Sequence, residues 1–129
     1  MRYIGKHRDM KLRYDQLSLL SGVLSKLKNE KEIEEFLISL LSPSELAYMS
    51  QRLHIMKMLL NDITYQQIQH DVGTTPSTIS ATKIILKDVS RKYKTVIATQ
   101  KIVSNNSKNA EYFKERENWI NPKYPGAIR

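Results

Sequence analysis

Short polar side chains dominate one stretch of this chain, from Thr64 to Ser80. Five of the seven residues from 74 to 80 are threonine or serine, although a surface that only keeps a protein soluble normally carries lysine and glutamate. Hydroxyl and amide groups donate and accept hydrogen bonds, so they suit both phosphate oxygens and base edges. Two hydroxyls would be enough to cap helices, so the excess indicates a nucleic-acid contact. The side chains expected to face outward are Tyr65, Gln66, Gln69, Thr75, Ser77, Thr78 and Ser80.

Two lysines follow this stretch at helical spacing. Lys83 and Lys87 lie one and two turns further along, where their ammonium groups would reach flanking phosphates. Exposed backbone N–H groups at a helix start near Thr75 would also bind phosphate. The predicted DNA-contacting set is therefore Tyr65, Gln66, Gln69, Thr75, Pro76, Ser77, Thr78, Ser80, Lys83 and Lys87.

A helix-turn-helix over residues 65–84 would position these side chains. Residues 64–67 have the Thr-x-x-Gln spacing of a capping box, and Gly73 ends the short helix that follows. Thr74 or Thr75 can cap the next helix, with Pro76 in its first turn, where a missing N–H costs nothing. Two helices joined by a short turn with glycine make this unit. The expected interior positions are Ile68, Val72 and Ile79.

Helical periodicity continues along most of the chain. Apolar residues recur at three- and four-residue spacing over 12–28, 33–41, 46–60 and 91–103. Asn29 is suited to cap the second of these helices, and Ser42, Pro43 and Glu45 form a strong start for the third. Nothing indicates a strand with confidence. The sequence predicts an all-α fold of about six helices.

The charge is concentrated toward the two ends of the chain. The formal net charge is +8 overall, with +4 in residues 1–13, −3 in residues 14–73 and +7 in residues 83–129. Such basic ends fit a polyanionic partner, or they only keep a small protein soluble. We expect a basic arm over 1–13, a helical domain over 14–103, and a linker with an aromatic tail over 104–129. Tyr112, Phe113, Trp119 and Ile120 share one helical face in that tail.

Several classes of protein are excluded or disfavoured. There is no cysteine, which excludes thiol nucleophiles and cysteine-ligated metal sites. His7, His54 and His70 lack acidic residues at ligand spacing, and the acidic run 30–35 fits the first turns of a helix, so we expect no metal site. With no glycine-rich phosphate loop and no catalytic motif, we expect no catalytic residue and no enzyme. No apolar run is long enough to span a membrane, so a cytoplasmic protein is expected.

The order of these motifs resembles the Trp repressor family over about residues 12–103. The likeness rests on residues 40–45, the Gln51-Arg52-Leu53 run, Thr64 and Tyr65 with Ile68, Val72-Gly73, and the run 77–80. It implies an intertwined homodimer whose first two helices, over 12–41, cross between subunits. It also implies operator binding through the helix-turn-helix, with residues 76–89 as the reading helix.

The resemblance also implies a small-molecule pocket, and one residue departs from it. Arg52 matches the family's arginine on the third helix, and Ser42 matches a hydroxyl position in the same pocket. Ala81 stands where the family has a second arginine, so an indole would lose a stacking partner there. A small-molecule effector stays open, but Ala81 argues against tryptophan. Arg52 could instead bridge acidic neighbours at a dimer interface.

We therefore predict a transcriptional regulator that binds double-stranded DNA at a near-palindromic operator as a homodimer. The resemblance to the Trp repressor family implies that this regulator is a repressor. Two alternatives stay open at this point. A similar helix-turn-helix occurs in DNA-rearrangement accessory proteins, which bind end repeats. The chain could also be a protein-interaction module whose basic ends contact acidic partners, without specific DNA binding.

Overall fold

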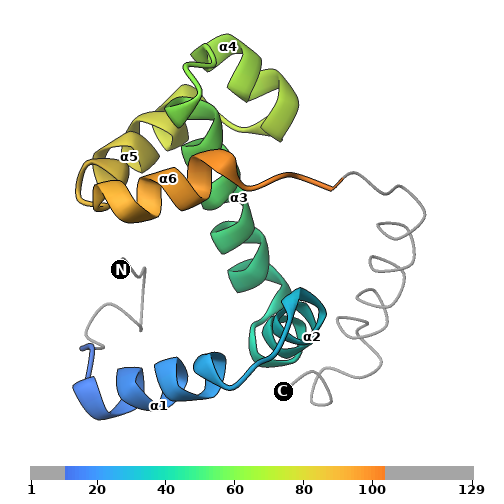
Figure 1. The fold of residues 1–129 in the computed structure, drawn as a ribbon. Helices are drawn as coiled ribbons and strands as arrows, with labels where there is room; N and C mark the ends of the chain where they lie inside the picture. Colours follow the sequence, from blue (N-terminus) through green and yellow to red (C-terminus); the bar gives the residue numbers. More distant parts are fainter. Residues whose placement is uncertain (1–10, 104–129) are drawn as a thin grey trace, which may run out of the picture. The chain divides into compact units, whose positions relative to one another are not determined.

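The computed structural model describes residues 11–103, and this part of the chain is helical throughout (Figure 1). It contains six α-helices and one short π-helical turn, and no strand is found in the described residues. The predicted all-α fold is confirmed. The chain divides into two compact units, Met1–Ser42 and Pro43–Arg129.

The N-terminal unit contains two helices, α1 (Tyr14–Ser25) and α2 (Glu30–Leu40). As predicted, Asn29 caps α2, because its side chain accepts a hydrogen bond of 2.9 Å from the Glu32 N–H. The Glu32 carboxylate in turn accepts from the Lys28 N–H at 2.9 Å, which fixes the chain as it enters the helix. Helix α1 is shorter than the predicted span 12–28. Its C-cap is Lys26, whose N–H donates a hydrogen bond to the Val23 carbonyl three residues earlier.

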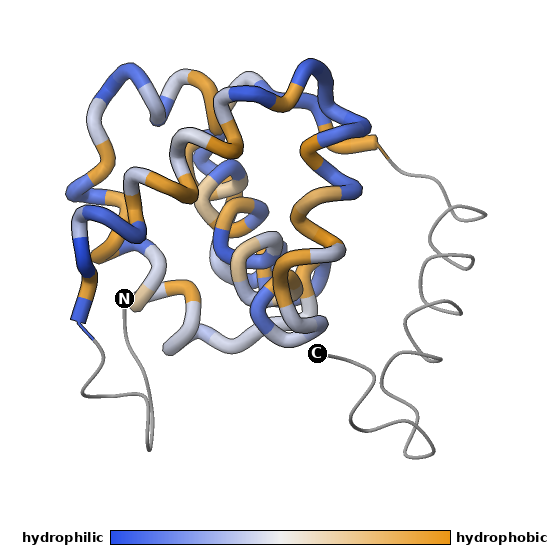
Figure 2. Tube along the Cα trace, turned by 90° about the horizontal axis from the view of Figure 1, so that it is seen from below, coloured by the Kyte–Doolittle hydropathy of each residue, from blue (hydrophilic) through white to orange (hydrophobic). Residues whose placement is uncertain are grey.

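No residue among those described in the N-terminal unit is buried. Figure 2 shows hydrophobic and hydrophilic residues alternating along the chain, as expected for amphipathic helices. Leu17 and Leu20 lie on the apolar face of α1 and are each 39% exposed, whereas Leu19 on another face is 70% exposed. Within residues 11–42, therefore, the apolar faces of the two helices are formed but contain no buried side chain.

The second unit begins with α3 (Pro43–Leu60), which starts at the residue that the sequence indicated. Two residues after its end, Asp62 has a φ of +60° and so adopts the left-handed conformation that short polar side chains tolerate. Leu53 and Met56 both belong to the apolar pattern predicted over residues 46–60. Met56 is buried, but Leu53 stays exposed and Ile55 is fully buried instead, because α3 is apolar on two faces in this half.

The helix-turn-helix contains α4 (Tyr65–Ile68), the π-helical turn η2 (Gln69–Gly73) and α5 (Pro76–Lys87). Its core is made by Ile55, Ile68 and Ile79, one isoleucine from each of three elements. Ile68 and Ile79 were predicted as interior positions, and Val72 packs at the edge of the same cluster. These three side chains hold α5 at a fixed angle to α3.

Helix α6 (Arg91–Thr99) packs against α3 and ends before the predicted limit of 103. The Lys57 ammonium group on α3 donates a hydrogen bond of 2.8 Å to the Ala98 carbonyl near the C-terminus of α6. The Asn61 amide donates to the same carbonyl at 3.3 Å. A cation at this end of a helix is favourable because of the helix dipole. Helices α5 and α6 therefore both pack against α3.

Candidate nucleic-acid interface

The first helix of the helix-turn-helix begins at the predicted cap. The Thr64 hydroxyl accepts a hydrogen bond of 3.2 Å from the Gln67 N–H. The Gln67 side chain, expected to turn back toward Thr64, instead donates to the Asp71 carboxylate at 2.8 Å. His70 lies 3.1 Å from the same carboxylate, and its hydrogen bond, followed by that of Gln67, lowers the Asp71 pKa. These contacts tie α4 to η2 at the surface.

The turn between the two helices depends on Gly73. Its φ is +76°, a conformation that residues with a side chain adopt at a cost. The chain then enters α5 through Thr75, whose hydroxyl accepts a hydrogen bond of 3.3 Å from the Thr78 N–H. The structure thus selects Thr75 rather than Thr74 as the cap, with Pro76 at the first helical position.

Three hydroxyl groups meet at the start of α5. The Thr75 hydroxyl lies 3.1 Å from that of Ser77 and 3.0 Å from that of Thr78. One turn further along, the Thr82 hydroxyl is buried and donates to the Thr78 carbonyl at 2.9 Å. Mutual hydrogen bonds fix the orientation of these side chains before any partner arrives. The cluster can offer donors and acceptors to phosphates or base edges without reorganisation.

The predicted DNA-contacting residues separate into two groups by exposure. Tyr65, Gln69 and Thr78 are half-buried, and Tyr65 also packs against the isoleucine core. The others are exposed: Gln66, Thr75, Pro76, Ser77, Ser80, Lys83 and Lys87. Six of these seven lie at or beyond Thr75, so the exposed polar surface belongs mainly to α5.

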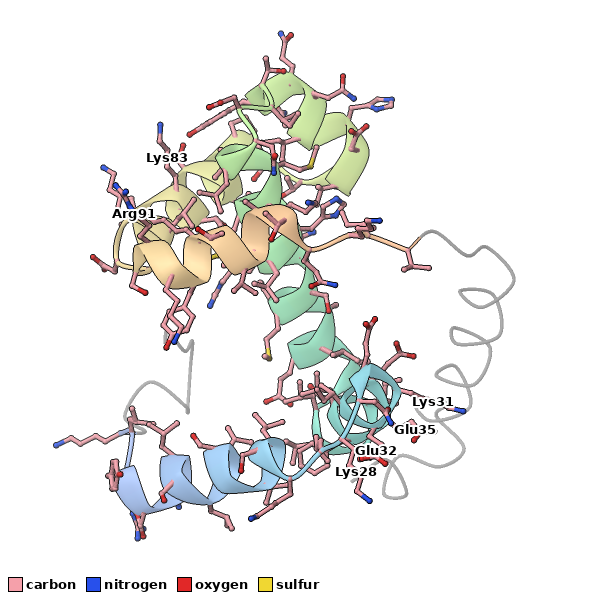
Figure 3. All side chains as sticks on the ribbon, in the orientation of Figure 1. Lys28, Lys31, Glu32, Glu35, Lys83 and Arg91 are labelled. Carbon is pink, nitrogen blue, oxygen red and sulfur yellow. The ribbon has the colours of Figure 1, made fainter. Side chains whose placement is uncertain are left out.

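Basic side chains flank this surface. Lys83 and Arg91 extend outward from α5 and α6 on the side away from α3 (Figure 3). Lys83 and Lys87 are exposed, and no acidic residue occurs between Pro76 and Lys87. The first carboxylate after the helix is Asp88, at its C-cap. The outer side of α5 is therefore positive and suited to a polyanion.

A hollow of about 260 Å³ separates part of α3 from α5. The predicted pocket residue Arg52 lines it, together with Tyr48 and Gln51 from the same helix. Ala81 and Ile85 of α5 line it as well, so part of its α5 wall is apolar. The second predicted pocket residue, Ser42, is the last residue of the N-terminal unit and is half-buried. It is not among the residues that line the hollow. The hollow thus offers one guanidinium group and no second cation.

One exposed residue of α5 was not among the predicted DNA contacts. Ile84 is 60% exposed. It follows Ser77 by seven residues, about two helical turns, so the two side chains share a face of the helix. This spacing can be read from the sequence, but apart from Pro76 the predicted contact set contains only polar side chains.

Residues 11–103 contain no group of three histidine, aspartate or glutamate side chains that could hold a metal ion. Within the same range, no helix is both long enough and apolar enough to cross a membrane.

Comparison with protein families gives one match. A family model described as Trp repressor protein matches residues 15–101, which is most of the described chain. Neither the curated proteins nor the solved structures contain a match. The matched range includes all six α-helices except the first residue of α1.

Proposed function

The chain belongs to the Trp repressor family, a family of DNA-binding helix-turn-helix regulators rather than enzymes, and on that premise we propose that it is a sequence-specific transcriptional repressor. It binds a near-palindromic operator as a homodimer. The observation that carries this proposal is the outer surface of α5, where pre-oriented hydroxyl groups lie beside Lys83 and Lys87 without a carboxylate among them.

The two kinds of side chain on this surface have different roles. Ser77 and Ser80 are short and lie on the first turns of α5, so they read base edges in the major groove. Lys83 and Lys87 lie further along the helix and contact phosphates on either side. Arg91 extends the same basic flank onto α6 (Figure 3). Sequence preference therefore depends on the serines and overall affinity on the cations.

Apolar surface that the described residues leave exposed supports the homodimer. Leu17 and Leu20 form an exposed stripe on α1. An apolar hollow of about 280 Å³ lies between α3 and α6 and is bordered by Leu53, Val96 and Ile102. Contiguous exposed apolar surface often marks a protein interface. A two-fold dimer would place two α5 helices in successive major grooves, about 34 Å apart.

Tryptophan is not the effector in this proposal. The site that the family implies needs a cation on α5 to stack against an indole, and Ala81 and Ile85 occupy the α5 side of the hollow. The remaining residues, above all Arg52, leave room for another small molecule. DNA binding should therefore be independent of added tryptophan.

Selection of bound sites from randomised duplex DNA tests the proposal, using the full chain at near-physiological salt. We expect a near-palindrome, and a log–log salt dependence of affinity with a slope of about −5 for six phosphate contacts. Ser77→Ala and Ser80→Ala should change the recovered sequence, whereas Lys83→Ala should weaken binding to all sequences alike. Recovery of no motif, with and without a metabolite extract, would contradict the proposal and favour a protein-interaction module.

A further inference from the structure

One large apolar side chain lies on the outer face of α5. The face of this helix that packs inward is defined by Ile79, Thr82 and Leu86, all of which are buried. Ser77 and Ile84 are seven residues apart, so they lie nearly above one another, opposite that buried face. Ile84 is 60% exposed, in the middle of the surface described above.

Single exposed isoleucines are common, so exposure alone does not give Ile84 a role. Its surroundings do. Ser80 on the same side is exposed, small and uncharged, and the flank carries Lys83 and Lys87. A helix surface meant only for water would alternate lysine with glutamate, and α5 contains no acid. Apolar area surrounded by hydroxyls and cations fits a polyanion that also presents methyl groups.

The major groove of DNA is such a partner. Each T·A pair exposes the C5-methyl group of thymine there, and aliphatic side chains contact it. We propose that Ile84 reads thymine methyl groups, so that each half-site contains T·A pairs under this part of α5. The inference rests on the proposed function and adds the base class to it.

The geometry also gives the position of these thymines. Seven residues of helix separate Ser77 from Ile84, a rise of about 10 Å. Base pairs are spaced by 3.4 Å, so this rise corresponds to about three base-pair steps. With α5 lying along the groove, the thymines should be found about three pairs from the base that responds to Ser77→Ala.

Replacing thymine by uracil tests the proposal directly, because uracil lacks only the methyl group. The probe is the duplex recovered by selection, with each thymine of a half-site replaced in turn, and the protein is the full chain. Wild-type protein should bind the critical duplex about fourfold more weakly, which corresponds to about 0.8 kcal/mol for one methyl group. Ile84→Ala should bind the thymine and uracil duplexes equally well.

Ile85→Ala is the matched control. It changes the same residue type one position along, but Ile85 lines the hollow toward α3. This variant should retain the fourfold preference for thymine. Specific binding with no uracil effect at any position would overturn the inference and leave the proposed function intact. Equal loss of the preference in both variants would remove Ile84 from the contact, and absence of any specific DNA binding would overturn both proposals.

Discussion

The two units of the chain differ in how far their apolar side chains are buried. In the second unit, Ile55, Ile68 and Ile79 are fully buried and hold the helix-turn-helix together. In the described part of the N-terminal unit, apolar residues are as regularly spaced but none is buried. Burial of large aliphatic side chains is the main source of stability. The second unit therefore has its own core, whereas the described residues of the first contain none.

This contrast gives each unit a different part in the proposed function. Reading a base sequence requires side chains held in place before DNA arrives, and the isoleucine core with the Thr75 hydroxyl cluster provides that rigidity. Dimerisation requires exposed apolar surface, which α1 provides through Leu17 and Leu20.

Replacing a core isoleucine should have the largest effect on stability. Ile79→Ala removes a fully buried side chain from the only buried cluster described for residues 11–103, so the free energy of unfolding should fall by about 2–5 kcal/mol. Leu19→Ala, at a site that is 70% exposed in α1, should change it by less than about 0.5 kcal/mol. Urea unfolding measures both values. Similar losses for the two variants would remove the contrast between the units.

A charge on the apolar face of α1 should weaken self-association. Leu20→Glu places an unpaired carboxylate where the proposed partner packs, so the dimer dissociation constant should rise about 100-fold or more. Ser18→Glu adds the same charge to an exposed position of the same helix and should leave it nearly unchanged. Sedimentation equilibrium of the three proteins compares them. An unaltered dimer with Leu20→Glu would place the interface elsewhere.

Alanine at the two described glycines should shift stability in opposite directions. Gly73 has a φ of +76° and no atom within 4 Å of an added Cβ, so Gly73→Ala should destabilise the second unit by about 1 kcal/mol through the backbone alone. Gly22 lies inside α1 with open space around it, so Gly22→Ala should stabilise the helix by up to about 1 kcal/mol. Thermal unfolding followed by circular dichroism gives the two signs. A destabilising Gly22→Ala would mean that the partner packs closely at this residue.

The smallest expected effect concerns acid sensitivity. Hydrogen bonds from His70 and Gln67 lower the Asp71 pKa below its ordinary value of 3.8. A carboxyl group whose pKa is lower in the folded state stabilises it above the unfolded value, and this contribution is lost as the pH falls through the folded value. Stability should therefore decline below pH 3.8, and Asp71→Asn should make that decline shallower. The pH dependence of urea midpoints measures this, and identical profiles would show that the Asp71 contacts add nothing.

Local rules predicted the elements well, because caps and turns depend on adjacent residues. Asn29, Thr64 and Gly73 act where the sequence placed them. The helix ends were less accurate, since fraying depends on what covers the last turn. Which apolar residues are buried could not be predicted on α3, where Ile55 and Leu53 are equally apolar and only the packing of α5 distinguishes them.

For the candidate interface, residue types predicted the chemistry but not the exposure. Thr78 has a hydroxyl like that of Ser77, yet it is half-buried, whereas Ser77 is exposed. Ile84 is apolar, yet it lies on the outer face, because helix geometry rather than hydropathy decides where a residue points. The boundaries of the basic arm and of the helical domain stay predictions, and the arm up to residue 10 and the aromatic tail over 104–129 lie outside the described residues.

The most direct test of the central claim is the number of protein chains bound to one selected DNA site. Native mass spectrometry of the complex with the full chain should give two copies per duplex, and hydroxyl-radical footprinting should give two protected regions about 34 Å apart. Leu20→Glu should give single copies with one protected half-site and lower affinity. A wild-type complex with one chain and one protected region would contradict the division between a reading unit and a dimerisation unit.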